Sequence, residues 1–163
     1  MKTITVNLYQ FSELSEQAKK YAINKHYENE QYPFLSEDLI EFLKETLKEN
    51  NCEFDNLKLY YSLSYSQGDG LCFIGELTKN NKTLILKHYS HYYYSTSVNM
   101  QFIDNETGDE IETDNELKNI YLSTCNKLEE YGYSILEYRM NIDEFTEFSD
   151  LNEYLYYENG TQY

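Results

Sequence analysis

The feature that most constrains the fold is a strict period-two alternation in the middle of the chain. Apolar or aromatic side chains occupy every second position there, at Leu57, Leu59, Tyr61, Leu63 and Tyr65. This spacing predicts a strand with one buried face. The short turns at residues 67–70 and 80–82 suit antiparallel neighbours, because parallel strands need long crossover connections. The segment therefore predicts an antiparallel β-meander.

Helical patterns lie on both sides of this segment. The expected N-terminal caps are Ser12 or Ser15 for the first helix, Ser36 for the second, and the pair Thr113 and Glu116 for the third. Gly132 is expected to end the third helix. The predicted helices cover residues 15–28, 36–49, 113–131 and 143–148, and the predicted strands cover 57–65, 71–77, 83–89 and 92–103, with further strands at 3–8, 133–139 and 153–158. We expect an α+β fold, with helices on one face of an antiparallel meander of about four strands. We also expect a single domain over residues 1–163, since this length suits one core.

Acidic residues dominate the charge, especially in the second half. The chain has 29 Asp and Glu against 13 Lys and Arg, a formal net charge of −16. Seven carboxylates crowd thirteen positions without a cation among them: Asp104, Glu106, Asp109, Glu110, Glu112, Asp114 and Glu116. Such a chain is not expected to bind nucleic acid directly, because phosphate binding depends on Lys and Arg. It is not expected to cross a membrane either, because its apolar runs are too short.

Two interpretations of this carboxylate-rich stretch remain open at this point. The simpler one is a solvated face that keeps the protein soluble. The other is an electrostatic imitation of nucleic acid, in which carboxylates occupy a basic groove that normally holds phosphates. Electrostatic steering would then speed the association.

The sequence contains no motif for a catalytic site or a cofactor. A phosphate-binding loop, the zinc motif H-E-x-x-H, the nucleophile elbow and the dinucleotide fingerprint are all absent. Cys52, Cys72 and Cys125 are too widely spaced for a zinc site, and their odd number fits reduced thiols in the cytoplasm. We therefore expect no enzymatic activity, no cofactor and no metal.

Two short segments suggest an alternative binding site. The glycines on either side of Asp69 suit a hairpin turn, or a loop that presents polar groups to an anion. The second segment is rich in His and Tyr, whose rings stack on bases or pack in a sheet. The alternative ligand-binding residues are Gln67, Asp69, His88, His91 and Tyr92.

The run LYYSLSYSQGDG at residues 59–70 resembles a family of small acidic proteins of phages and prophages, loosely labelled antitoxins of toxin–antitoxin systems. Residues 11–19, 35–39, 87–93 and 152–156 are similar to that family as well. The resemblance implies a phage context, in which small acidic proteins disable host defence. Anti-CRISPR proteins and other DNA mimics do so by filling a cationic channel.

These observations together predict a phage-encoded inhibitor that acts in the cytoplasm of the bacterial host. Its expected partner is a host protein with a basic nucleic-acid-binding groove, such as a CRISPR effector, and the carboxylates of residues 104–116 would contact it. Two alternatives remain: an antitoxin that neutralises a cognate toxin, and a module that binds a small molecule or nucleotide.

Overall fold

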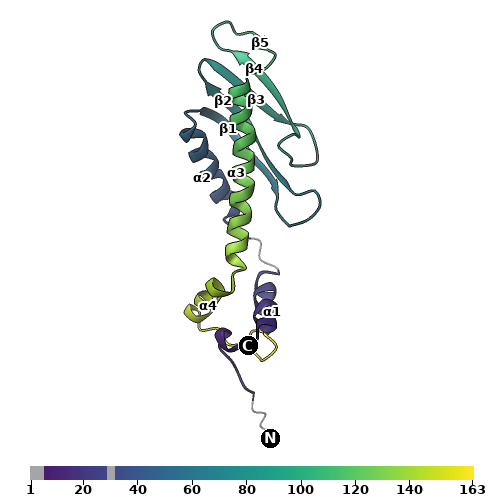
Figure 1. The fold of residues 1–163 in the computed structure, drawn as a ribbon, viewed down its shortest axis with the longest axis vertical. Helices are drawn as coiled ribbons and strands as arrows, with labels where there is room; N and C mark the ends of the chain where they lie inside the picture. The colour runs from purple at the N-terminus through teal and green to yellow at the C-terminus, as the bar shows by residue number, and fades with distance from the viewer. Residues whose placement is uncertain (1–5, 29–31) are drawn as a thin grey trace. The chain divides into compact units, whose positions relative to one another are not determined.

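The computed structural model describes residues 6–28 and 32–163, which form two compact units. Unit 1 combines Met1–Pro33 with Ser134–Tyr163, and unit 2 is the continuous segment Phe34–Tyr133 (Figure 1). Each unit has its own buried side chains. That the two units fold as a single domain over residues 1–163 stays a prediction.

Unit 2 contains the predicted antiparallel meander. Five strands lie side by side in chain order: β1 (Glu53–Ser62), β2 (Gly70–Lys79), β3 (Lys82–His88), β4 (Val98–Asp104) and β5 (Glu110–Ile111) (Figure 1). Every neighbouring pair is antiparallel. The α+β class and the meander are confirmed. The expected number of about four strands is exceeded by the two-residue β5, which lies inside the acidic stretch.

Helices α2 (Leu35–Glu49) and α3 (Asn115–Arg139) supply the helical layer of unit 2. The ring of Tyr121 in α3 lies 4.9 Å from that of Phe73 in β2, and both side chains are buried. From α2, the core receives its buried leucines Leu39, Leu43 and Leu47. The i, i+4 spacing of these leucines puts them on one helical face, as the sequence pattern predicts.

Gly132 does not end the third helix, so this prediction and that of a strand over 133–139 are wrong. Gly132 lies buried inside α3, where a β-carbon would be 2.5 Å from Leu63 Cδ1 and 3.4 Å from Leu39 Cδ2. The glycine therefore permits close packing of the helix against its neighbours. Helix and turn patterns in sequence cannot separate that role from a terminating one.

One other predicted cap and the start of one predicted strand differ in the structure. Helix α2 begins one residue before Ser36, with Phe34 at the N-cap. Residues 92–97 form a loop instead of the start of the predicted strand, and β4 begins at Val98. Both differences are local and leave the meander unchanged.

Unit 1 packs three helical segments around an aromatic core. They are η1 (Phe11–Glu13), α1 (Glu16–Tyr27) and α4 (Ile142–Leu151). Of the two candidate caps, Ser15 caps α1 by accepting a hydrogen bond from the Ala18 amide. Phe11, Phe145 and Tyr156 meet in the core. Tyr156 makes isolated bridges to Tyr9 and Gln162 where a strand over 153–158 is predicted. The predicted strand at 3–8 begins outside the described residues.

The packing at Gly132 gives the first prediction. Alanine favours a helix over glycine by about 1 kcal/mol, whereas overlap of its methyl group with the Leu63 side chain costs about 1–3 kcal/mol, so Gly132→Ala is expected to lower the free energy of unfolding by up to about 2 kcal/mol. Urea unfolding followed by circular dichroism measures the change. Asn126→Ala, at an exposed position of the same helix, is the control and should be neutral or slightly stabilising. A Gly132→Ala variant more stable than wild type by about 1 kcal/mol, as at an open helical position, would contradict this packing role.

Candidate functional site

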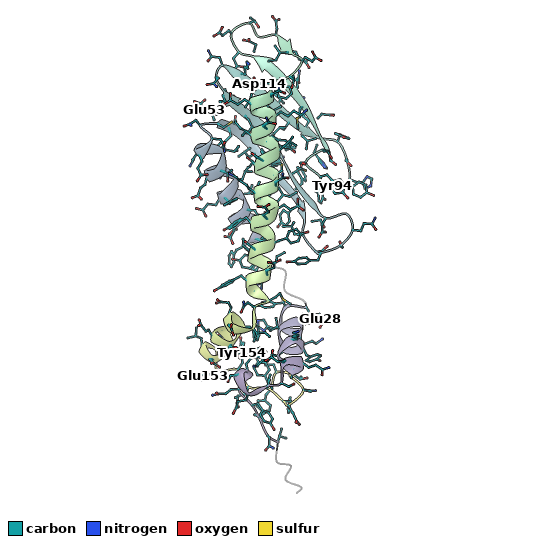
Figure 2. All side chains as sticks on the ribbon, viewed as in Figure 1. Glu28, Glu53, Tyr94, Asp114, Glu153 and Tyr154 are labelled. Carbon is teal, nitrogen blue, oxygen red and sulfur yellow. The ribbon has the colours of Figure 1, made fainter. Side chains whose placement is uncertain are left out.

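The seven crowded carboxylates gather at one end of unit 2, which we call the acidic end. It comprises Asp104, Glu106, Asp109, Glu110, Glu112, Asp114 and Glu116. They run from the last residue of β4 through β5 to the first turn of α3, and Figure 2 marks Asp114 beside the start of that helix. Because β4 and β5 pair antiparallel, the chain turns back on itself here and keeps these side chains local.

Asp114 fixes the acidic end to the sheet. Its Oδ1 accepts a hydrogen bond from the Leu117 amide at 2.8 Å, so Asp114 caps α3 in place of the predicted Thr113 and Glu116 pair. Its Oδ2 accepts a second hydrogen bond from Lys82 Nζ at 2.7 Å. The hydrogen bond from Lys82, followed by that from Leu117, lowers the pKa of Asp114.

The turn between β2 and β3 supports two further carboxylates. Glu116 pairs with Lys79 Nζ at 2.9 Å and accepts a hydrogen bond from Asn80 Nδ2 at 3.2 Å. Glu106 accepts one from Asn81 Nδ2 at 3.0 Å. Sequence reasoning identified this turn but missed its role as the support of the acidic end. Its Lys-Asn-Asn-Lys composition was the available signal.

The acidic end stays strongly negative despite these contacts. Five of its residues, namely Glu106, Asp109, Glu110, Glu112 and Glu116, are exposed, and only two lysines pair with the seven carboxylates. The remaining carboxylates of the second half lie elsewhere: those of residues 137–158 belong to unit 1. The stretch 104–116 therefore lies at one end of the meander, with Asp104 and Glu110 on opposite faces of the sheet, because Glu110 pairs with Ile103, the neighbour of Asp104 in β4.

Asp69, an alternative ligand-binding residue, is the centre of a hydrogen-bond network within its own loop. Its Oδ1 accepts from the hydroxyls of Ser62, Ser64 and Ser66 at 3.0, 2.9 and 3.2 Å. Its Oδ2 accepts from the amides of Ser64 and Ser66 at 2.6 and 3.1 Å, and from the Tyr133 hydroxyl at 2.8 Å. Six donors thus converge on one carboxylate and connect the loop to α3.

The pKa values of Asp69 and Tyr133 reflect this network of hydrogen bonds. Burial is the largest single influence and favours the protonated form of Asp69, but the hydrogen bonds from Tyr133 and Ser64 outweigh it together and hold the pKa well below its usual range. Burial, and then the bond to Asp69, raises the pKa of Tyr133 to about 12. Asp69 is therefore ionised at neutral pH, with its oxygens already occupied by internal donors. Tyr133 was not anticipated from sequence, because it is 64 residues away along the chain.

Of the other alternative residues, His88 ends β3, His91 and Tyr92 lie on the loop that follows it, and Gln67 lies on the loop between β1 and β2. The His88 ring stacks on Tyr60 at 4.9 Å, and its Nε2–H donates a hydrogen bond to the Tyr92 carbonyl at 2.9 Å. The His91 and Tyr92 rings are 4.0 Å apart. The Tyr92 ring is also 4.0 Å from the place where Gly68 would carry a β-carbon, so the two predicted loops are neighbours in space. Gln67 and His91 are exposed.

Within residues 6–28 and 32–163, no three His, Cys, Asp or Glu side chains gather in a way that could hold a metal ion. None of the helices in the same residues is both long enough and apolar enough to cross a bilayer. No protein family, curated protein or solved structure compared with this chain matches it.

The Asp69 network gives the second prediction. Asp69→Asn is expected to lower the free energy of unfolding at pH 7 by about 2 kcal/mol. The variant loses hydrogen bonds to a charged carboxylate, and its side-chain NH2 group, a donor, takes the place of one oxygen that accepts. A carboxyl group with a lower pKa in the folded state stabilises the fold above its unfolded pKa of about 4, and this contribution is lost as the pH falls further. The wild-type advantage over the variant should therefore shrink on acidification below about pH 4.

Urea titrations of both proteins at neutral and acidic pH measure this difference. Asp109→Asn, at an exposed carboxylate, is the matched control and should change stability by less than about 0.5 kcal/mol. A difference between wild type and Asp69→Asn that stays constant from neutral to acidic pH would contradict the role of the ionised carboxylate.

Proposed function

We propose that this protein is a non-catalytic inhibitor that binds a basic, nucleic-acid-binding protein through its acidic end. The single observation that supports the proposal best is that all seven carboxylates lie at one end of the meander of unit 2. Positioned carboxylates of this kind can occupy a groove that otherwise holds phosphates, and they attract it from a distance.

The internal contacts of the acidic end strengthen this proposal over a merely solvated face. Repulsion among neighbouring carboxylates costs stability, so a surface needed only for solubility gains nothing by concentrating them. Here Lys82 binds Asp114 and Lys79 binds Glu116, which holds the surrounding carboxylates in place without neutralising them. A preorganised surface loses less conformational entropy on binding.

The charge of unit 2 also agrees with a basic partner. Residues 34–133 contain 18 Asp and Glu against 8 Lys, so the acidic end lies within a unit that is itself negative. Phosphate-bearing ligands are disfavoured in that field. The resemblance to small acidic phage proteins points to a bacterial host protein in the cytoplasm, with a CRISPR effector as the first candidate.

The alternative of a nucleotide or small-molecule site is less well supported. It needs Asp69 to bind a ligand, whereas all six donors around its carboxylate come from the protein itself. His88 likewise uses Nε2 within its own loop. We therefore propose the inhibitor as the function.

Charge reversal tests the proposal. The double variant Glu110→Lys and Glu112→Lys should slow association with the partner about 10-fold or more at low salt, because steering depends on these exposed charges. The control is Glu41→Lys with Glu45→Lys on α2, which changes the net charge equally at another surface of unit 2. It should slow association much less.

The probe is a panel of purified CRISPR effectors loaded with guide RNA, and biolayer interferometry measures the rates. Raising the salt from about 50 to about 500 mM should slow association strongly, since screening shortens the reach of the charges. The proposal is wrong if no effector binds, or if binding is indifferent to both salt and charge reversal.

A further inference from the structure

Exposed aromatic rings form a second surface on unit 2. Large apolar or aromatic side chains that are exposed in this unit are Phe34 and four tyrosines, and the tyrosines all belong to the two neighbouring loops. We call this group the tyrosine surface: Tyr65, Tyr89, Tyr92 and Tyr94, which are 65%, 63%, 46% and 39% exposed. Clusters of exposed aromatic rings are uncommon on surfaces that only face water.

The two loops pack directly against each other. At Gly70 a β-carbon would lie 2.8 Å from Tyr94 Cδ1 and 3.1 Å from the Tyr93 carbonyl oxygen. Gly70 therefore lets the loop after β3 lie on the start of β2. The rings of Tyr92 and Tyr94 stack on one another at 5.5 Å, and Figure 2 marks Tyr94 on this part of unit 2, away from Asp114.

Hydrogen bonds hold the backbone that carries these rings. The Tyr92 amide donates to Ser90 Oγ at 3.1 Å, and the Tyr92 carbonyl accepts from His88. The Tyr89 hydroxyl donates to the Thr96 carbonyl at 3.1 Å. From α3, the Tyr121 hydroxyl donates to the Ser95 carbonyl at 3.1 Å. The loop is thus fixed from within and from the core while its rings face solvent.

Rigid Tyr and Ser loops of this kind suit protein recognition. Tyrosine offers a large contact area at low entropic cost, and serine supplies adaptable hydrogen bonds, which is why binding loops of antibodies are rich in both. Preorganised aromatic side chains are also typical of the residues that dominate binding energy.

The lack of charged side chains on this surface restricts the kinds of ligand that it can bind. Residues 89–103 contain no Lys, Arg, Asp or Glu, and the carboxylate of nearby Asp69 is bound internally. Without a cation, the surface cannot hold phosphates, so nucleic acid is disfavoured. Mutual stacking of Tyr92 and Tyr94 also covers ring faces that a base would need. Because the surface itself is uncharged, it would contact an uncharged area of the partner. The negative charge of the rest of unit 2 favours a partner that is basic overall.

We propose that the tyrosine surface is a second contact with the same basic partner protein, an inference that rests on the proposed function. Exposed ion pairs add little net affinity, whereas desolvated aromatic contacts govern dissociation. The acidic end would therefore set the association rate, and the tyrosine surface the lifetime of the complex. The seven residues of β3 separate the two surfaces by about 20 Å, a span that one protein interface covers.

The test compares Tyr92→Ala and Tyr89→Ala with Tyr163→Ala, an exposed tyrosine of unit 1 that serves as the control. The probe is the tightest-binding guide-loaded CRISPR effector of the panel described above. Each loop variant should speed dissociation about 30-fold while association and its salt dependence stay unchanged, and the control should match wild type. Urea unfolding of the variants verifies that the fold is retained; two positions are used so that one unfolded variant does not decide the result.

The outcomes separate this inference from the proposed function. Wild-type binding with unchanged dissociation in the folded loop variants would overturn the inference alone. Faster dissociation in these variants, combined with no effect of salt or charge reversal, would support the tyrosine contact and overturn the electrostatic function. Absence of wild-type binding to every effector would overturn both. Concentration-dependent self-association of wild type that Tyr92→Ala abolishes would replace the partner with a second copy of this chain, and so overturn the inference as well.

Discussion

Repulsion among seven neighbouring carboxylates is the constraint on which the structure of unit 2 depends. The β2–β3 turn meets it with two lysines and two asparagines, which bind Asp114, Glu116 and Glu106. Asp114 has the central place, because one carboxylate both caps α3 and pairs with the sheet. One carboxylate of the stretch thereby joins helix and sheet, and five of the others are exposed.

The opposite end of β3 has the reverse character. There the Asp69 carboxylate accepts its hydrogen bonds from donors of the protein itself. The neighbouring rings of the tyrosine surface carry no charge. Unit 2 thus carries a charged surface at one end of β3 and an uncharged aromatic surface at the other. Such a division suits a protein that must find a basic partner quickly and then stay bound, since charge governs encounter and desolvated contacts govern release.

Sequence periodicity was sufficient for the meander and for α1, which is capped by Ser15, one of the two predicted candidates. That the acidic stretch forms one partner-binding surface stays a prediction. Periodicity failed where tertiary packing decides the outcome. The pattern predicts a helix stop at Gly132, because the close contact of this residue with Leu63 is invisible in sequence. The strand expected from residue 92 is a loop held by Tyr121 from α3. The partner of Asp69 on α3 and the lysines beneath Asp114 could not be assigned for the same reason: each contact joins segments distant in the chain.

The most direct test is to map which residues of this chain are protected from hydrogen exchange when the partner is bound. Hydrogen–deuterium exchange of the protein, free and bound to a guide-loaded CRISPR effector, reports the contact residue by residue. The account predicts slower exchange over residues 104–116 and 89–97, with unit 1 unchanged. Protection confined to residues 6–28 and 134–163 would contradict it, because the contact would then avoid both the acidic end and the tyrosine surface.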